Sequence, residues 1–164
     1  MKKTGWMGAL LALLSLLGCD AQRLSELEVG VATEADVRAR FGSPENIWDG
    51  PGGTRVFEYN RQPAGHVNYM ISLGPDGRMV GLRQVLTPAN FERIQPGMRM
   101  EAVRQLLGKP AKITSFTLKR EVHYDWRYLD TPNTSMLFTV VFDPDYRVLR
   151  TFSVLDPSAS GDRN

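Results

Sequence analysis

The feature that most constrains this chain is an internal repeat that spans residues 24–155. The segment that ends at Gly30 matches the segment that ends at Gly97 in the spacing of its apolar residues. The matches that follow, in chain order, are Val37-Arg-Ala-Arg-Phe41-Gly42-Ser-Pro44 with Val103-Arg-Gln-Leu-Leu107-Gly108-Lys-Pro110, Phe57-Glu58-Tyr59 with Tyr124-Asp125-Trp126, Pro75-Asp76-Gly77-Arg78 with Pro144-Asp145-Tyr146-Arg147, and Val85-Leu86 with Val154-Leu155. Because their order is kept, the pattern predicts two copies of one structural unit, copy one at 24–86 and copy two at 87–155.

Each copy is expected to begin with two short helices. Thr33 is a good N-cap for a helix that carries Val37 and Phe41 on one face. That helix should end at Gly42, because glycine suits the left-handed position after a helix, and Pro44 prevents its continuation. Copy two has the same glycine and proline stop. A first, shorter helix is expected before the glycine that closes each opening segment.

Strands are expected in the remainder of each copy, because apolar and polar residues alternate there. The apolar rows are Phe57 and Tyr59, then Val67, Tyr69, Ile71 and Leu73 in copy one, and Tyr124, Trp126 and Tyr128, then Met136, Phe138, Val140 and Phe142 in copy two. Turns at 74–77 and 143–146 lead to third strands, and further short strands are expected at 46–48 and 113–117. The predicted fold class is therefore α+β: two tandem helix-helix-sheet repeats, each with two short helices packed on a three- to four-stranded antiparallel sheet. Since a unit of about 65 residues is marginal alone, we expect the copies to pack together.

The N-terminus has the pattern of a secretion signal. Lys2 and Lys3 precede an apolar run from Trp6 to Leu17. As a helix this run would span about 18 Å, short of the roughly 30 Å of a bilayer's hydrocarbon core. It therefore fits a signal peptide at 1–18 better than a membrane span.

The segment Leu16-Leu17-Gly18-Cys19 resembles the lipobox of bacterial lipoproteins. The resemblance implies cleavage before Cys19, acyl chains such as palmitate on that residue, and a short lipidated tether at 19–23. The alternative is a plain secretion signal with an incidental cysteine. Asp20 follows the cysteine, and aspartate there usually favours retention in the inner membrane of enteric bacteria.

Composition excludes several function classes. Cys19 is the only cysteine, so the chain has no internal disulfide and no thiolate metal site. Outside residues 1–18, basic and acidic residues balance, and no overall positive field remains to attract nucleic acid. We expect no nucleic-acid partner. Residues 156–164 are small and polar and are expected to form a disordered tail.

Catalytic motifs are missing from the sequence. His66 and His123 fall at different points of the repeat, so they do not form a duplicated site, and structural roles are expected. Glu58 and Asp125 do repeat, but they are expected on the outer face of a strand, where a carboxylate needs no catalytic role. The glycines at 50, 52 and 53 lack the lysine of a phosphate loop and indicate a turn. We expect no enzyme, catalytic residue, metal, cofactor or small-molecule substrate.

Two features allow a binding role. The aromatic rows are expected in the core, with a partner-binding sheet face as the alternative. One stretch carries a single acid, Glu101, among seven basic residues. These are Arg93, Arg99, Arg104, Lys109, Lys112, Lys119 and Arg120. They are expected to form either a solvated face or a surface that meets acidic partners or lipid headgroups.

The string from Ile94 to Pro110, Ile-Gln-Pro-Gly-Met-Arg-Met-Glu-Ala-Val-Arg-Gln-Leu-Leu-Gly-Lys-Pro, resembles the signature of the BamE (SmpA/OmlA) lipoprotein family. The resemblance implies an outer-membrane lipoprotein that faces the periplasm. It also implies an accessory role in β-barrel assembly, with subunits of that machine as partners. Two alternatives stay open: an inner-membrane lipoprotein of unknown binding role, and an inhibitor lipoprotein of a periplasmic enzyme, because β-lactamase inhibitor proteins share a similar tandem plan.

Overall fold

The computed structural model describes residues 27–160, so the expected signal peptide, Cys19 and Asp20 lie outside the described residues. In copy one, the helix α2 (Glu34–Phe41) precedes a four-stranded antiparallel sheet, called sheet one below. Its strands, in chain order and in sheet order, are β1 (Asn46–Asp49), β2 (Arg55–Asn60), β3 (Asn68–Leu73) and β4 (Met79–Gln84). The 3₁₀ helix η1 (Pro51–Gly53) joins the first two strands.

Copy two repeats this order. It begins with the short helix α3 (Pro88–Phe91) and the helix α4 (Met100–Leu107). Sheet two follows, with β5 (Lys112–Phe116), β6 (Glu121–Asp130), β7 (Thr134–Phe142) and β8 (Val148–Leu155) in antiparallel order. The 3₁₀ helix η2 (Thr117–Lys119) joins β5 to β6, and the 3₁₀ helix η3 (Pro157–Ser160) follows β8.

The expected fold class, an α+β fold of two helix-helix-sheet repeats, is wrong. The protein is mostly β, with two four-stranded antiparallel sheets and only a few short helices among the described residues. The prediction failed because the first helix expected in each copy is almost absent from the described part of the chain. Residues 29–31 form a turn ahead of α2, and α3 has four residues. Pro96 and Gly97, whose φ is 85°, stop continuation of α3, and so short a segment gains too few hydrogen bonds to offset helix nucleation.

The individual strands lie close to the positions that the alternation predicted. Phe57 and Tyr59 lie in β2, and the row from Tyr69 to Leu73 lies in β3, whose register pairs Phe57 with Ile71 and Tyr59 with Tyr69. Sheet two has the corresponding pairs in β6 and β7. The short strands expected at 46–48 and 113–117 correspond to β1 and β5.

The helix boundaries also follow their local signals. The Thr33 hydroxyl accepts from the Asp36 amide at 3.3 Å, and the Asp36 carboxylate accepts from the Thr33 amide at 2.9 Å, which forms a capping box. The helix ends at Gly42, with φ of 80°, as α4 ends at Gly108, with φ of 77°. Arg99 at the start of α4 makes no side-chain capping bond.

Each copy has its own hydrophobic core. In copy one, Val37 and Phe41 of α2 pack on the sheet face that carries Phe57, Tyr59 and Ile71. In copy two, Val103 and Leu107 of α4 pack on Tyr124, Trp126 and Phe138 together with Phe91. The two clusters are separate. What joins the copies is therefore a different set of contacts.

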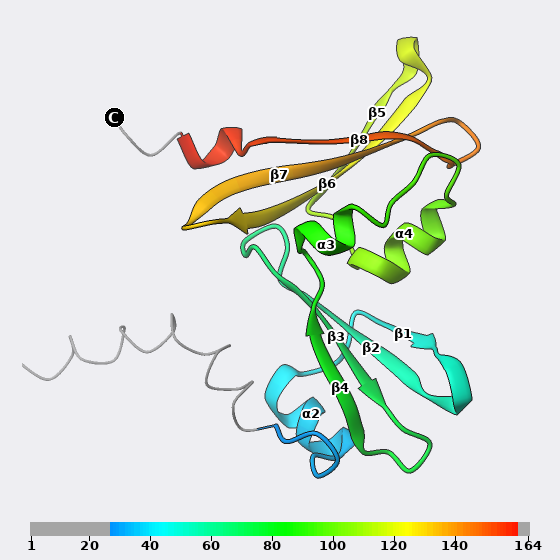
Figure 1. Cartoon of the computed structure of the whole chain (residues 1–164), viewed down its shortest axis with the longest axis vertical. Helices are drawn as coiled ribbons and strands as arrows, with labels where there is room; N and C mark the ends of the chain where they lie inside the picture. The colour runs from blue at the N-terminus through cyan, green and yellow to red at the C-terminus, as the bar shows by residue number, and fades with distance from the viewer. Residues whose placement is uncertain (1–26, 161–164) are drawn as a thin grey trace, which may run out of the picture.

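Figure 1 shows the order of the layers. Helix α2 lies against the lower sheet, and α3 and α4 lie between sheet one and sheet two. One face of sheet one thus packs on its own helix, and its opposite face meets α4 of copy two. The expectation that the copies pack together is confirmed by hydrogen bonds between them. No helix within residues 27–160 is long and apolar enough to cross a membrane.

Candidate functional site: the groove between the copies

Glu58 is the centre of the contact between the copies. Its side chain projects from β2, on the face opposite α2, and is fully buried. One carboxylate oxygen accepts from the backbone amide of Lys109 at 2.6 Å and lies 3.6 Å from the Arg104 guanidinium. The other accepts from the Trp48 indole at 3.2 Å. Glu58 thus lies on the face of its strand that points away from the core of copy one, but the end of α4 covers this face and buries the carboxylate.

Asn68 extends the same contact on the neighbouring strand. It is fully buried, and its side-chain amide donates to the carbonyls of Leu107 at 2.9 Å and Lys109 at 3.0 Å. The Leu107 carbonyl belongs to the last turn of α4, where carbonyls have no partner within the helix, and Lys109 follows the C-cap Gly108. Gly108 between them approaches so closely that a Cβ there would lie 3.0 Å from the Asn68 amide nitrogen. Sheet one thus binds a helix end through backbone groups.

A second set of bonds joins the loop after β2 to sheet two. The Gln62 side-chain amide accepts from the Arg127 backbone amide at 3.0 Å and donates to its carbonyl at 2.9 Å. Gln62 thus satisfies the backbone groups of Arg127 on the edge of β6, beyond the start of β5, in place of a neighbouring strand. The Arg127 guanidinium donates to the carbonyl of Pro63 at 2.8 Å, and His66 bonds Ser135 at 2.9 Å. Contacts at two separate places fix the orientation of the copies.

A groove of about 570 Å³ opens beside the Glu58 contact. Its apolar lining comes from both copies: Trp48, Val56, Val85, Met98, Ala102 and Leu106. Its polar lining consists of Asp49, Arg83, Arg93 and Gln105. Trp48 is held in place by its bond to Glu58. The residues that join the copies therefore also shape the groove.

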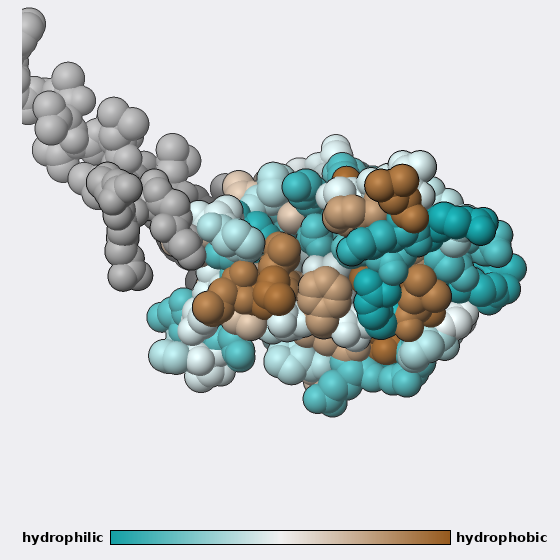
Figure 2. Space-filling view, turned by 90° about the horizontal axis from the view of Figure 1, so that it is seen from above, coloured by the Kyte–Doolittle hydropathy of each residue, from teal (hydrophilic) through white to brown (hydrophobic). Residues whose placement is uncertain are grey.

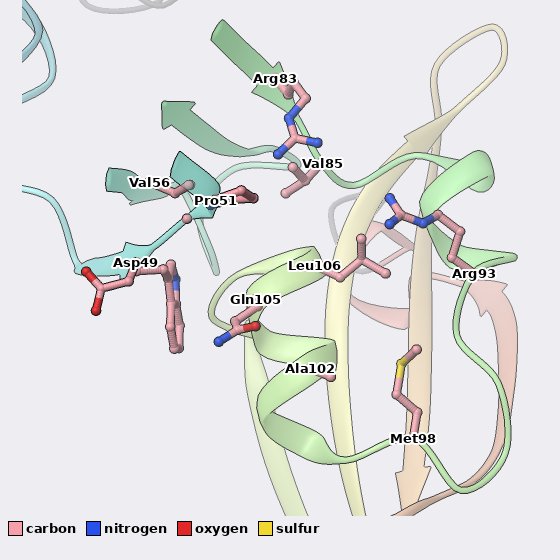
Figure 3. A pocket seen from close by; sticks show the side chains of 12 residues that line it. Asp49, Pro51, Val56, Arg83, Val85, Arg93, Met98, Ala102, Gln105 and Leu106 are labelled. Carbon is pink, nitrogen blue, oxygen red and sulfur yellow. The ribbon is translucent and has the colours of Figure 1, made fainter. Parts of the chain in front are cut away.

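Two guanidinium groups dominate the charge of this groove. Figure 3 shows Arg83 from the sheet-one side and Arg93 from the segment after α3, extending toward each other above Leu106. Within residues 27–160, Arg83 makes no hydrogen bond or ion pair, and Arg93 bonds only the neutral Asn90 side chain at 3.2 Å. Asp49 is the one acid in the lining. The groove therefore offers two cations over an apolar floor.

Such a groove suits an acidic protein segment. A guanidinium can bind a carboxylate through two parallel hydrogen bonds, and arginine, methionine and aromatic residues are enriched where proteins meet. The lining contains no histidine, cysteine, serine or lysine that could act as a nucleophile or base. No group of three potential metal ligands occurs within the described part of the chain. The two guanidinium groups over an apolar floor suit the binding of a carboxylate.

The structure separates the seven basic residues that the sequence grouped together. Arg93 lines the groove, Arg104 meets Glu58, and Lys109 pairs with Glu45 at 2.5 Å. The remaining four are Arg99 at the start of α4, Lys112 on β5, and Lys119 and Arg120 at the β5–β6 turn. They do not form one surface. Arg83, the second cation of the groove, lies in copy one and was missed, because only the fold places it near Arg93.

Both histidines have structural partners. Burial and the nearby Arg127 guanidinium lower the pKa of His66. His123 bonds Glu121 at 3.0 Å and packs on Phe116 with ring centroids 4.4 Å apart. Hydrogen bonds from Arg150 and then His123 hold the pKa of Glu121 at about 2. Neither histidine lines the groove.

The aromatic rows form the two cores, as expected. The edge strand β8, in contrast, exposes apolar side chains. These are Leu149, Phe152, Val154 and Leu155. Figure 2 looks at the molecule from the side of β8 and shows apolar groups interrupted by hydrophilic ones. This surface lacks the hollow and the converging charges of the groove.

Comparisons with known proteins correct the family assignment. No family model matches the chain, and no curated protein matches it. Among solved structures, a DUF4309 family protein (YjgB) from Bacillus subtilis matches at 20% identity and a TM-score of 0.31, over 79% of this chain and 82% of that one. A candidate β-lactamase inhibitor protein from Streptococcus mutans matches at 12% identity and a TM-score of 0.35, over 82% of this chain and 96% of that one.

At these TM-scores neither likeness carries an argument about this chain. The comparisons support no membership of the BamE family, so that identification is wrong, and so is the β-barrel assembly role that it implied. The string from Ile94 to Pro110 corresponds in the structure to a turn, the helix α4 and its glycine and proline stop. These are general helix-boundary signals, which unrelated proteins share.

Proposed function

We propose that the protein is a lipid-anchored binding protein of the bacterial cell envelope that captures an acidic segment of another protein in the groove between its copies. The observation that carries this is the convergence of Arg83 and Arg93, neither with an acidic partner among the described residues, over an apolar floor. A carboxylate of the partner would bind between the guanidinium groups, and an adjacent apolar side chain would displace water from Leu106 and Val85.

Inhibition of a periplasmic enzyme is the form of binding that we favour. A groove formed by two fixed units binds a projecting loop without a conformational change, and occupation of an enzyme's loop can block access to its active site. The protein itself would act without catalysis, cofactor or metal.

We further propose that Cys19 carries the anchor and that the protein remains on the periplasmic face of the inner membrane. The expectation of an outer-membrane location rested on the BamE resemblance, whereas Asp20 favours the inner membrane. Membrane fractionation of the native host tests this. Banding with the inner membrane supports the proposal, and a shift outward in Asp20→Ser would identify the signal. Banding of the unaltered protein with the outer membrane contradicts it.

The binding proposal is tested by capture from membranes in mild detergent. Arg83→Glu combined with Arg93→Glu reverses both groove charges and should reduce recovery of a specific partner at least tenfold. Arg99→Glu with Lys119→Glu is the matched control, because it makes the same change of charge at exposed residues outside the groove. Thermal unfolding should show that both variants fold.

The enzymatic activity of the captured partner provides a second measurement. If the captured protein is an enzyme, the wild-type protein should lower its activity and the groove variant should not. Equal recovery of the same partners by the groove variant and the control would overturn the proposal. Loss of inhibition in both variants would show that general charge, and not the groove, is responsible.

A further inference from the structure

The contact between the copies uses one helix end and one sheet face, and the chain contains a second example of each. The helix end is the segment Leu107–Pro110 after α4, and the face is formed by Glu45, Glu58 and Asn68. By the repeat, the second helix end is Phe41–Pro44, and the second face is formed by Ala111, Asp125 and Leu137. We call these the free helix end and the free face.

The free helix end has the conformation of the docked one. Gly42 and Gly108 have φ of 80° and 77°, and the carbonyl of each accepts from a core aromatic side chain, Tyr59 at 3.1 Å and Trp126 at 3.0 Å. They differ in their surroundings. A Cβ on Gly108 would meet Asn68, Glu58 and Met70, whereas a Cβ on Gly42 would meet nothing within 4 Å.

The free face has the backbone geometry of the occupied one, with Leu137 at the position of Asn68. The backbone amide of Ala111 donates to the backbone carbonyl of Asp125 at 2.8 Å, as the amide of Glu45 donates to the backbone carbonyl of Glu58 at 2.8 Å. Asp125 pairs with Thr139 across β6 and β7, as Glu58 pairs with Met70 across β2 and β3. The equivalence therefore holds in backbone register as well as in sequence.

A groove of about 500 Å³ lies on the free face, where the occupied face holds the end of α4. Asp125, Leu137 and Lys112 line it, and Pro63 and Pro157 contribute to its walls. One Asp125 oxygen accepts from the Thr139 hydroxyl at 2.7 Å, and the other has no partner within residues 27–160. The carboxylate can thus accept a backbone amide, as Glu58 accepts that of Lys109.

We infer that the occupant of the free face is the free helix end of a second copy of this chain. The Ser43 amide would donate to Asp125 as the Lys109 amide donates to Glu58. The docked helix end carries Lys109, which would repel Lys112 on the free face, whereas the free helix end carries the neutral Ser43 at that position. This inference does not rest on the proposed function, because it uses another surface.

The predicted association is head to tail. Each molecule that docks its free helix end leaves its own free face open, so the contact propagates into chains or rings rather than stopping at a symmetric dimer. Binding through a short helix end is expected to be weak, and it depends on concentration at the membrane.

The test uses the full-length lipoprotein in detergent. Sedimentation of the wild-type protein should show an average mass that rises with concentration. Ser43→Lys gives the free helix end the cation of the docked one, which would meet Lys112 on the free face, and should weaken association at least tenfold. Combining Ser43→Lys with Lys112→Glu should restore it, and Lys119→Glu, outside both surfaces, should have no effect.

Mapping of the contact provides an independent measurement. A photo-cross-linking residue introduced at Ser43 should join to the segment 111–112 or to Leu137 of another molecule. Rescue by the charge exchange together with this cross-link supports the inference. A monomer at all concentrations up to about 1 mM, association unaffected by Ser43→Lys, or a cross-link joining position 43 of two molecules would overturn it.

Discussion

The two sheets place equivalent carboxylates in opposite environments. Glu58 and Asp125 occupy the same position of the repeat and the same register of their sheets, yet Glu58 is fully buried, whereas Asp125 is half-buried at a groove. The difference arises because the helix end of copy two covers this face of sheet one, whereas within residues 27–160 no helix end covers the equivalent face of sheet two. A repeated sequence therefore does not imply a repeated environment.

The comparison also separates two kinds of contact. Each copy is held together by an apolar core, whereas the two copies are joined largely by hydrogen bonds to backbone groups. Backbone amides and carbonyls at a helix end are present in almost any sequence, and one matched face suffices to bind them. A second sheet face can therefore bind a helix end specifically after only a few side-chain changes.

The largest expected effect comes from removing the two carboxylates one at a time. Glu58→Ala leaves the Arg104 guanidinium, the Lys109 amide and the Trp48 indole without their acceptor in a buried place. We expect a loss of about 3 kcal/mol in the free energy of unfolding, as for other broken buried pairs. Asp125→Ala removes one hydrogen bond to Thr139 and should cost about 1 kcal/mol. Urea unfolding measures both, and equal losses would contradict the difference between the faces.

The two helix-ending glycines give the next largest contrast. Gly42→Ala and Gly108→Ala both place a side chain in a backbone conformation that strongly favours glycine, which costs roughly 1–3 kcal/mol in each case. Gly108→Ala also crowds Asn68 and Glu58, at 3.0 and 3.2 Å from the new Cβ. We expect it to be more destabilising than Gly42→Ala by about 1 kcal/mol. The backbone strain is similar in the two variants, so the difference between their losses of unfolding free energy measures the contact of Gly108 with sheet one.

The sequence predicted what depends on local pattern and failed where distant parts meet. Alternation located Phe57 in β2 and Trp126 in β6, and glycine and proline marked the ends of α2 and α4. The burial of Glu58 was not predictable in this way. Its partner Lys109 lies 51 positions further along the chain, and no spacing signals which sheet face a helix end will cover.

The candidate site shows the same limit. Arg93 appeared in a basic stretch, but the groove also needs Arg83 and Trp48 from the other copy. The capping signals at Pro88–Phe91 predict a helix, but the helix has only four residues, so the protein is mostly β and not α+β. Capping residues show where a helix begins, and length determines how much it contributes.

A pH-dependent difference is expected between the segments that follow the two sheets. Thr87 caps α3, and Asp156 takes the same place before η3, with its carboxylate accepting from Ser158, Arg127 and Ser135. Burial raises the pKa of Asp156, but these hydrogen bonds outweigh it and hold the pKa at about 2, against 3.8 for an ordinary aspartate. Because the folded pKa is depressed, its stabilisation is present above pH 4 and is lost as pH falls toward 2.

We therefore expect Asp156→Asn to flatten the decline in stability between about pH 4 and pH 2, by an amount on the order of 1 kcal/mol after solvent screening. Thr87→Val, at the equivalent uncharged cap, should leave the slope of stability against pH in this range unchanged. Urea unfolding at several pH values measures both slopes. A wild-type slope that persists in Asp156→Asn would assign the acid sensitivity to other carboxylates.

The smallest contrast lies at the starts of the two main helices. Thr33 caps α2 through a capping box, whereas Arg99 at the equivalent start of α4 offers no side-chain acceptor. Arg99 already has the extended backbone of a capping residue, with φ of −75° and ψ of 147°, so a short polar side chain can be introduced there without rearrangement. We expect Arg99→Ser to stabilise the protein by about 0.5–1 kcal/mol and Thr33→Ala to destabilise it by about 1 kcal/mol. Thermal unfolding of the two variants measures the contrast. A neutral Arg99→Ser would show that water satisfies the first amides of α4 as well as a hydroxyl does, and that copy two needs no cap because its helix is held at the other end by Glu58 and Asn68.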